Sequence, residues 1–310
     1  MQPVHIAGLV SHSNLLLRGI FPLSTFFFSV FSLCVYDMEM KYLRPVAVVL
    51  IVVLSAACGS RRIETPEGYT LVWNDEFSRR SLDESKWNAF LGGGGFGNRE
   101  LQFYRPDNLE VSGGNLIITA DREFYLSHPY TSGMITTREK ASWQYGRFEF
   151  RARLPSGQGI WPAIWMLPDD PDRYGTWPVS GEIDILELVG HQPATAHGYL
   201  HYGEPHTYTG SSFTLPEGRF SDGYHVFALE WDPEEFRWYV DGQLVQTQTE
   251  WFSTNVLTGQ AHPYPAPFDQ PFYLRINVAV GGNWPGPPDE TTEFPQKMYL
   301  DYVRVFQRSF

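Results

Sequence analysis

Cysteine is nearly absent from this sequence: 310 residues contain two, Cys34 and Cys58, and none follows Cys58. No intramolecular disulfide can therefore stabilise the chain beyond that point, and a hydrophobic core must hold the fold alone. Residues 59–310 suffice for this, because β-sandwich and barrel domains commonly run about 200–250 residues as one unit.

Positive charge is also scarce. Lys and Arg number 23 against 35 Asp and Glu, which gives a net charge of −12 and argues against nucleic acid or an anionic polymer as the main partner. Aromatic residues, in contrast, make up 16% of the chain. Their flat apolar faces suit sugar rings, although aromatic packing between two sheets is the alternative explanation.

Long helical periodicity is missing, and alternation with a period of two replaces it. Segment 147–154 alternates throughout, and its apolar members should face a core: Phe148, Phe150, Ala152 and Leu154. Five further segments have the same strand character: 115–120, 227–231, 236–240, 272–280 and 298–306. Asp241-Gly242 is a two-residue hairpin signal. We predict an all-β, antiparallel β-sandwich of two packed sheets, without internal repeats or a second domain.

Residues 40–58 have the three parts of a secretory signal. Lys41 and Arg44 are positive, 46–54 are apolar, and 55–57 are small. The apolar run is well short of the roughly 20 residues that a spanning helix needs. We predict export, with an ordinary anchor helix or a core strand as the alternative.

Cys58 lies where a bacterial lipoprotein signal places its lipidated cysteine, although Ser55 stands where Leu is preferred. This pattern predicts a cell-envelope lipoprotein at the outer membrane or cell surface, which touches the membrane only through its anchor; plain secretion is the alternative. Residues 59–68 would be a tether and 69–310 the catalytic domain. Residues 1–39 are either read-through from a start codon placed too early, upstream of Met40, or a first membrane span.

The most informative segment is 180–188, SGEIDILEL. Glu182 and Asp184 share one strand face, with isoleucines on the other. Regular alternation would turn Glu187 into the core, where an unpaired charge costs several kcal/mol. We therefore predict a β-bulge near residues 185–186, which returns Glu187 to the face of Glu182.

Two glutamates separated in this way lie roughly 6–7 Å apart at Cα. Their carboxyl groups can then reach the separation of about 5–5.5 Å that a retaining glycosidase uses. Repulsion between like charges keeps one of them protonated, and Asp184 can share a proton with Glu182. A solvated acidic face or a calcium site would explain three acids equally well, but the tryptophan-rich segment 159–168 and Trp177 favour a sugar cleft.

This segment resembles the E-x-D-x-x-E signature of glycoside hydrolase family 16, in the bulged form typical of laminarinases. The resemblance covers nearly all of 69–310, with the following segments in family order: 73–77, 82–87, 98–104, 130–133, 145–149, 277–286 and 300–305. It implies a concanavalin A-like jelly roll with a concave substrate cleft. It also implies retaining endo-hydrolysis of β-1,3-glucosidic bonds in laminarin-type glucans, by a monomer that needs no cofactor for its chemistry.

The resemblance assigns Glu182 as nucleophile, Asp184 as its assistant and Glu187 as acid/base. It also suggests a set of substrate-binding residues: Trp161, Trp165, Trp177, Asn98, Glu100, His201, Asn277 and Trp284. Trp165 has core packing as its alternative, Asn98 and Glu100 a turn and a solvated acid, and His201 a structural role. His191 and His197 stay unassigned.

Family members often carry a structural calcium, which Glu76, the carbonyl of Gly114 and Asp301 would bind here. Asp301 has an exposed edge-strand acid as its alternative interpretation. The sequence departs from the family at Met134, where many laminarinases carry Arg; this leaves the details of one glucose subsite open.

Competing functions remain. Mixed-linkage glucan or an algal galactan could be the substrate of a family-16 hydrolase, but lichenases typically lack the bulge residue, and sulfated galactans call for more cations in the cleft. A β-glucan-binding protein of the same fold usually loses a catalytic Glu, whereas all three acids are present here. The carboxylate strand also argues against a lectin-type sandwich without chemistry.

Overall fold

The structure is a computed structural model that describes residues 63–255 and 258–308. The predicted leader, signal and lipid-modified Cys58 lie outside these residues. In the described part, no helix has the length and apolar character that a membrane crossing requires. Thr65–Phe310 make up one compact unit.

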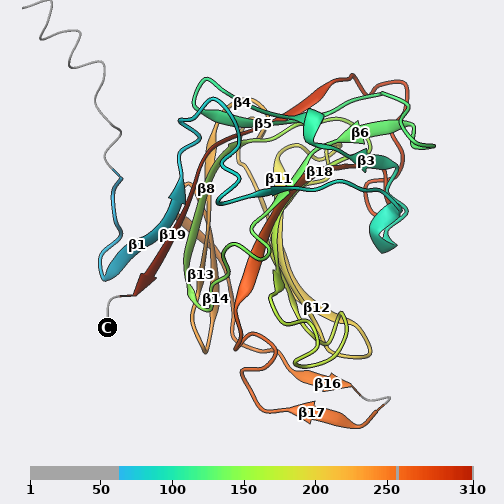
Figure 1. The fold of residues 1–310 in the computed structure, drawn as a ribbon. Helices are drawn as coiled ribbons and strands as arrows, with labels where there is room; N and C mark the ends of the chain where they lie inside the picture. The colour runs from blue at the N-terminus through green and yellow to red at the C-terminus, as the bar shows by residue number, and fades with distance from the viewer. Residues whose placement is uncertain (1–62, 256–257, 309–310) are drawn as a thin grey trace, which may run out of the picture. The chain divides into compact units, whose positions relative to one another are not determined.

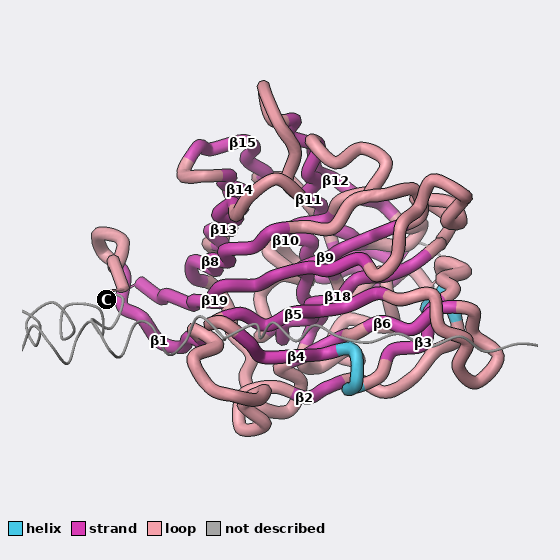
Figure 2. The backbone as a smooth tube through the Cα atoms, turned by 90° about the horizontal axis from the view of Figure 1, so that it is seen from above, coloured by secondary structure: helices cyan, strands magenta, loops and turns pink. Residues whose placement is uncertain are grey.

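Two antiparallel sheets make up most of this unit (Figures 1 and 2). We call the first the site sheet, because it carries the acidic strand. Its seven strands, in spatial order, are β12 (Thr207–Thr214), β11 (Thr195–Tyr202), β10 (Glu182–Glu187), β9 (Ile160–Pro168), β18 (Phe272–Val280), β7 (Met134–Thr136) and β2 (Asn88–Ala89).

The second, which we call the outer sheet, has eight strands. Seven follow the order β15 (Gln243–Gln248), β14 (Phe236–Val240), β13 (His225–Trp231), β8 (Gly146–Arg153), β19 (Gln296–Arg308), β5 (Asn115–Ala120) and β4 (Leu109–Ser112). The eighth, β1 (Tyr69–Asp75), pairs with β19. Smaller elements complete the described chain: the pair β16 (Ser253–Asn255) and β17 (Gln260–His262), the parallel pair β3 (Gln102–Tyr104) and β6 (Tyr130–Ser132), and the 3₁₀ turns η1 (Gly95–Gly97) and η2 (Pro106–Asn108).

The core lies between the two sheets, as the alternation predicts. The four apolar residues expected to face inward from 147–154 are at most 1% exposed: Phe148, Phe150, Ala152 and Leu154. Strands β5, β14 and β18 have the predicted bounds, while β13 and β19 extend beyond theirs. Asp241 and Gly242 join β14 to β15 with φ of 49° and 79°, the left-handed values of a tight two-residue hairpin. The antiparallel sandwich is confirmed.

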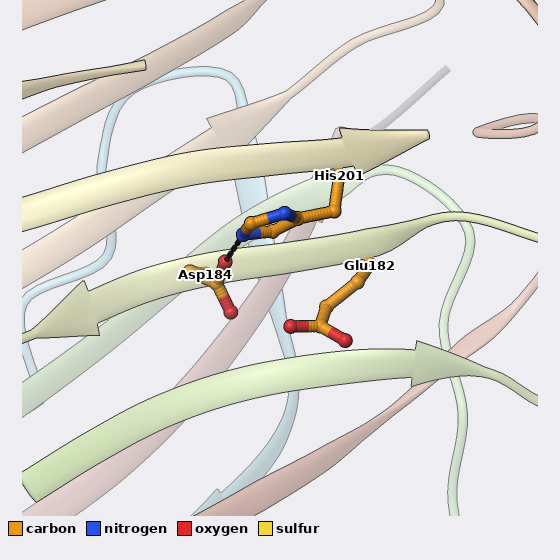
Figure 3. Close-up of side chains that lie close together, drawn as sticks. All are labelled: Glu182, Asp184 and His201. Carbon is orange, nitrogen blue, oxygen red and sulfur yellow. Dashed lines mark ion pairs between the residues drawn. The ribbon is translucent and has the colours of Figure 1, made fainter. Parts of the chain in front are cut away.

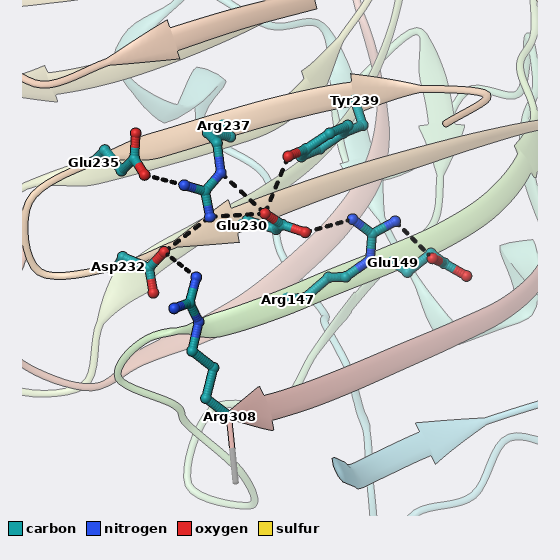
Figure 4. A network of polar contacts seen from close by, with 8 residues as sticks. All are labelled: Arg147, Glu149, Glu230, Asp232, Glu235, Arg237, Tyr239 and Arg308. Atoms are coloured by element: carbon teal, nitrogen blue, oxygen red, sulfur yellow. Dashed lines mark hydrogen bonds and ion pairs between the residues drawn. The ribbon is translucent and has the colours of Figure 1, made fainter. Parts of the chain in front are cut away.

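A network of charged side chains covers part of the outer sheet (Figure 4). Arg147 donates to Glu149 and Glu230 at 3.0 Å each, and Arg237 bonds Glu230 from the adjacent strand. Asp232, Glu235, Tyr239 and Arg308 extend the network. Burial by itself would raise the pKa of Glu230, but hydrogen bonds from Arg237, Tyr239 and Arg147 outweigh it, so the pKa is lowered overall.

We expect Arg147→Met to lower the melting temperature by roughly 3–6 °C near pH 7, because two half-buried carboxylates lose a shared partner. Partial exposure keeps the loss below that of a fully buried pair. A carboxyl with a lowered pKa contributes stability above its unfolded pKa and loses it as pH falls through the folded value. The difference from the wild type should therefore shrink towards about pH 3 in thermal unfolding by circular dichroism.

Arg138→Met is the matched control, since Arg138 is exposed and 4.0 Å from its nearest acid. It should leave the melting temperature unchanged. An Arg147→Met difference that stayed constant across pH would mean that packing, and not charge pairing, was lost.

Candidate active site

Strand β10 contains the predicted bulge. Against β11, Asp184 pairs with Tyr199 and Glu187 with His197. An advance of three residues along β10 therefore lies opposite an advance of two residues along β11. The register against β9 shifts at the same place. The apolar residues of β10 are at most 4% exposed and belong to the core: Ile183, Ile185 and Leu186. The extra residue therefore lets the strand bury its apolar side chains while Glu187 stays on the face of Asp184.

The three acids are crowded and largely removed from water. Asp184 is 2% exposed and Glu187 8%, while Glu182 is half-buried. Burial, aided by the charge of Asp184, raises the pKa of Glu182 to about 8. Burial also raises the pKa of Asp184. The pKa of Glu187 is raised well above its usual value by burial and then by the charges of Asp184 and Glu182. Such a set retains at least one proton at neutral pH, and Glu187 is the strongest candidate to hold it.

Two indole N–H groups orient the glutamates. Trp161 donates to Glu187 Oε1 at 3.0 Å, and Trp177 donates to Glu182 Oε2 at 2.9 Å. Trp177 is 51% exposed, so its ring is open to solvent. Each of the two glutamates thus accepts a hydrogen bond from a residue outside its own strand. These bonds fix the positions of the carboxyl groups, as catalysis requires.

Trp165 lies on the same face of the sheet, between the buried residues Ile164 and Met166 of β9. It is half-buried and outside the core cluster, so the core-packing alternative does not describe it. Its indole donates to Asn277 Oδ1 at 2.7 Å, and Asn277 Nδ2 in turn donates to the hydroxyl of Tyr104 at 3.0 Å.

His201 lies opposite Glu182 in the register and contacts Asp184 (Figure 3). Its Nε2 is 3.0 Å from Asp184 Oδ2. On its other side, Nδ1 is 2.8 Å from Nε2 of His206. Sequence reasoning placed His201 at the sugar and missed His206 altogether. The signal available was the spacing of the two histidines, five residues apart across the turn from β11 to β12.

Of the remaining substrate-binding candidates, Trp284 and Asn98 lie near Trp161, and Glu100 lies beside Gln102. The backbone N–H of Asn283 donates to the carbonyl of Asn98 at 2.7 Å, which joins the two loops. The ring of Trp284 lies 5.7 Å from that of Trp161 and 4.8 Å from that of His197. Burial raises the pKa of Glu100, whose Oε2 accepts from Gln102 Nε2 at 2.6 Å.

The two unassigned histidines differ. His191 is exposed. His197 is paired with Glu187 in the register, and its Nε2 is buried without a hydrogen-bond partner among the described residues. Burial lowers its pKa, which favours the neutral imidazole.

The residues predicted to bind calcium do not fit that role in this arrangement. Both oxygens of Glu76 accept from Arg304, at 2.8 and 2.7 Å. Asp301 Oδ2 accepts from Arg151 at 2.6 Å, and Gly114 is in the turn between β4 and β5. Calcium prefers six to eight oxygen ligands with carboxylates among them, and it would have to displace a guanidinium from each acid here.

The chain is similar to known proteins in sequence and in fold. The family model described as "Glycosyl hydrolases family 16" matches residues 98–304. A β-glucanase of Rhodothermus marinus is 46% identical in an alignment of 280 residues that covers 86% of this chain and 96% of that protein. The solved laminarinase of Rhodothermus marinus has a TM-score of 0.70 at 47% identity, covering 78% of this chain and 98% of that one. The laminarinase catalytic domain of Thermotoga maritima MSB8 has the same TM-score at 41% identity, covering 79% of this chain and all of the other.

Proposed function

The chain belongs to glycosyl hydrolase family 16, and from this premise we propose that it is an endo-β-1,3-glucanase that cuts laminarin-type β-glucans with retention of configuration. The observation that carries the proposal is the bulge between Asp184 and Glu187, because it keeps Glu187 on the same face as Glu182. The names of the relatives, β-glucanase and laminarinase, support the substrate.

The proposed reaction has two displacements. The carboxylate of Glu182 attacks the anomeric carbon, while Glu187 gives its proton to the departing glycosidic oxygen, so that a glycosyl–enzyme ester forms. Glu187, now ionised, takes a proton from water, and the resulting hydroxide displaces Glu182. This cycle requires Glu187 to enter protonated, which agrees with the raised pKa of that carboxyl. Carboxyl groups carry both steps, so the chemistry needs no cofactor.

Asp184 and His201 act on Glu182 and not directly on the sugar in this proposal. Asp184 shares the strand face of Glu182, and its charge is among the causes that raise the pKa of Glu182. The imidazole beside Asp184 offsets part of that charge, because His201 lowers the pKa of Glu182. The attack requires the ionised carboxylate of Glu182, which is the form that His201 and the N–H group of Trp177 favour.

Substrate binding falls to side chains around the acids. We assign the exposed rings of Trp177 and Trp284 to sugar stacking, since they are 51% and 40% exposed. Trp161, which bonds Glu187, would contact the sugar beside the scissile bond. Asn98 and Glu100 would donate or accept hydrogen bonds with hydroxyl groups. Asn277, predicted for the same role, is 5% exposed and its amide is bonded to Trp165 and Tyr104, so it positions Trp165 instead.

Parallel digestion of laminarin, lichenan, agarose and carrageenan tests the proposal. We expect rapid loss of laminarin to a ladder of oligosaccharides, slower action on lichenan, and none on the two galactans. Proton NMR of the earliest products should show the β-anomer before mutarotation. Faster cutting of lichenan or agarose would transfer the proposal to the competing substrates, and binding of laminarin without cutting would favour a glucan-binding protein.

We also propose that residues 40–58 direct export and that Cys58 is lipidated, as the signal pattern indicates. Labelling with radioactive palmitate in a bacterial host should mark the wild type and not Cys58→Ser. A labelled Cys58→Ser variant would mean that the lipid is attached at another residue, and an unlabelled but exported wild type would favour plain secretion.

A further inference from the structure

Arg275 is a cation on the site face that the mechanism above does not use. It lies on β18, where it is paired with Trp165 of β9 on one side and with Thr136 of β7 on the other. Its neighbours along the strand, Leu274 and Ile276, are fully buried in the core. Alternation therefore directs Arg275 to the opposite face, the one that carries the three acids.

The guanidinium of Arg275 is packed against apolar groups. Its carbon is 4.4 Å from the ring centre of Trp165 and 5.8 Å from that of Phe90. The group thus covers one face of the indole that the sequence suggested as a sugar platform. At this point of the site a sugar would meet N–H donors and not an open aromatic face.

These donors are almost unused. Among the residues that the structure describes, no carboxylate lies within ion-pair distance of Arg275. Within the described part of the chain, its one side-chain hydrogen bond is from Nη2 to the sulfur of Met134 at 3.0 Å, and a thioether is a weak acceptor. A guanidinium has five N–H groups. Arg275 is half-buried, and its nitrogens are not among the described side-chain atoms that are buried without a hydrogen-bond partner, so they are open to solvent and to a bound ligand. A ligand would supply the acceptors that the described residues do not.

The charges around Arg275 indicate the kind of ligand. Arg275 is close enough to Glu182 and Glu100 to lower the pKa of each. With Asp184 and Glu187, four carboxyl groups of the described chain therefore share this region with the guanidinium of Arg275. A sulfated or carboxylated polymer would be repelled by such a set, whereas the oxygens of a neutral sugar accept hydrogen bonds without adding charge.

We propose that Arg275 is a specificity-determining residue that donates hydrogen bonds to the hydroxyl groups of the neutral glucosyl unit next to the one attacked, on the β9–β18 side of the acids. This inference rests on the proposed function. It also gives a role to the contact with Met134, the position at which this sequence departs from the family: Arg275 brings a guanidinium to Met134 from the neighbouring strand.

The test compares Arg275→Met with Arg275→Lys. The methionine keeps an apolar stem against Trp165 but has no donors, and the lysine keeps the charge without the planar fork. For laminarihexaose we expect Arg275→Met to raise KM about tenfold or more with a smaller change in kcat, and Arg275→Lys to recover part of the loss. Arg153→Met is the matched control, because Arg153 lies 4.2 Å from the ring of Tyr299 on the outer sheet. It should leave KM unchanged.

Loss of charge near Glu182 also has a pH signature. Glu182 is faced by Asp184 and Glu187 on its own strand, by His201 and its partner His206, and by Arg275. Of these groups the variants change only Arg275, whose positive charge favours the ionised carboxylate of Glu182. The acid limb of the kcat/KM profile should therefore move to higher pH in Arg275→Met and stay in place in Arg275→Lys. A merely structural arginine would move neither KM nor this limb, and that result would overturn the inference.

Calorimetric titration with laminarihexaose, in a Glu187→Gln background that prevents turnover, separates this inference from the proposed function. A tenfold weaker Kd on adding Arg275→Met supports the role of Arg275 whether or not the wild type cuts laminarin. An unchanged Kd, or no binding of laminarihexaose at all, overturns it. Tighter Arg275-dependent binding of carrageenan than of laminarin would refute the commitment to a neutral sugar.

Discussion

Glu187→Gln is expected to lower kcat/KM on laminarin by roughly 10³-fold or more, and Glu182→Gln by at least as much. The first change removes the proton that the leaving oxygen needs, and the second removes the nucleophile itself. Glutamine keeps the size of each side chain, and Trp161 and Trp177 can still donate to its carbonyl oxygen, so both variants should fold. Initial rates with reducing-sugar detection, alongside thermal unfolding, measure the two effects separately. Near-native turnover in either variant would contradict the assignment.

Azide distinguishes the two roles. In Glu182→Ala, azide replaces the missing nucleophile in one displacement on an activated aryl β-glucoside, so the product should be the inverted α-glucosyl azide. In Glu187→Ala, azide attacks the glycosyl–enzyme in place of water after a first displacement by Glu182, so the product should be the β-glucosyl azide. Proton NMR of the azides reads the configuration directly. The same anomer from both variants would mean that the roles of the two glutamates are wrongly divided.

Asp184→Asn should reduce kcat by roughly 10²-fold and displace the basic limb of the pH–rate profile. Asp184 is 2% exposed, and its charge contributes to the raised pKa of both Glu187 and Glu182. The acid/base must be protonated to act, and a raised pKa keeps it so up to a higher pH. Without the charge of Asp184 the pKa of Glu187 falls, and the basic limb should move to lower pH.

His206→Phe is a useful comparison for this experiment, because His206 contacts His201 and not the acids. It should leave the basic limb in place. A basic limb that did not move in Asp184→Asn would show that burial alone sets the proton affinity of Glu187, and would remove Asp184 from the electrostatic part of the mechanism.

Much of the fold follows from local pattern. A period of two in segment 147–154 indicates a strand with one buried face, and its four apolar residues are buried as expected. Asp241-Gly242 marks its hairpin because few residue pairs adopt two successive positive φ values easily. The bulge in β10 could be predicted for an energetic reason: without it, the strand would bury the charge of Glu187 in the core.

The contacts that surround the acids could not be predicted in this way. Arg275 meets Met134 across 141 positions of sequence, Asn277 meets Tyr104 across 173, and Arg304 meets Glu76 across 228. Alternation tells which face a side chain takes, but the register between distant strands decides which residues share a row.

The sequence by itself therefore determined the all-β class, the inward residues and the three acids on one strand face, because each of these depends on spacing along a single segment. Only the tertiary structure decided that His201 pairs with Asp184 and His206, that Arg304 holds the carboxylate proposed for calcium, and that a guanidinium covers Trp165. Those contacts join different strands, and their geometry exists only after the sheet has formed.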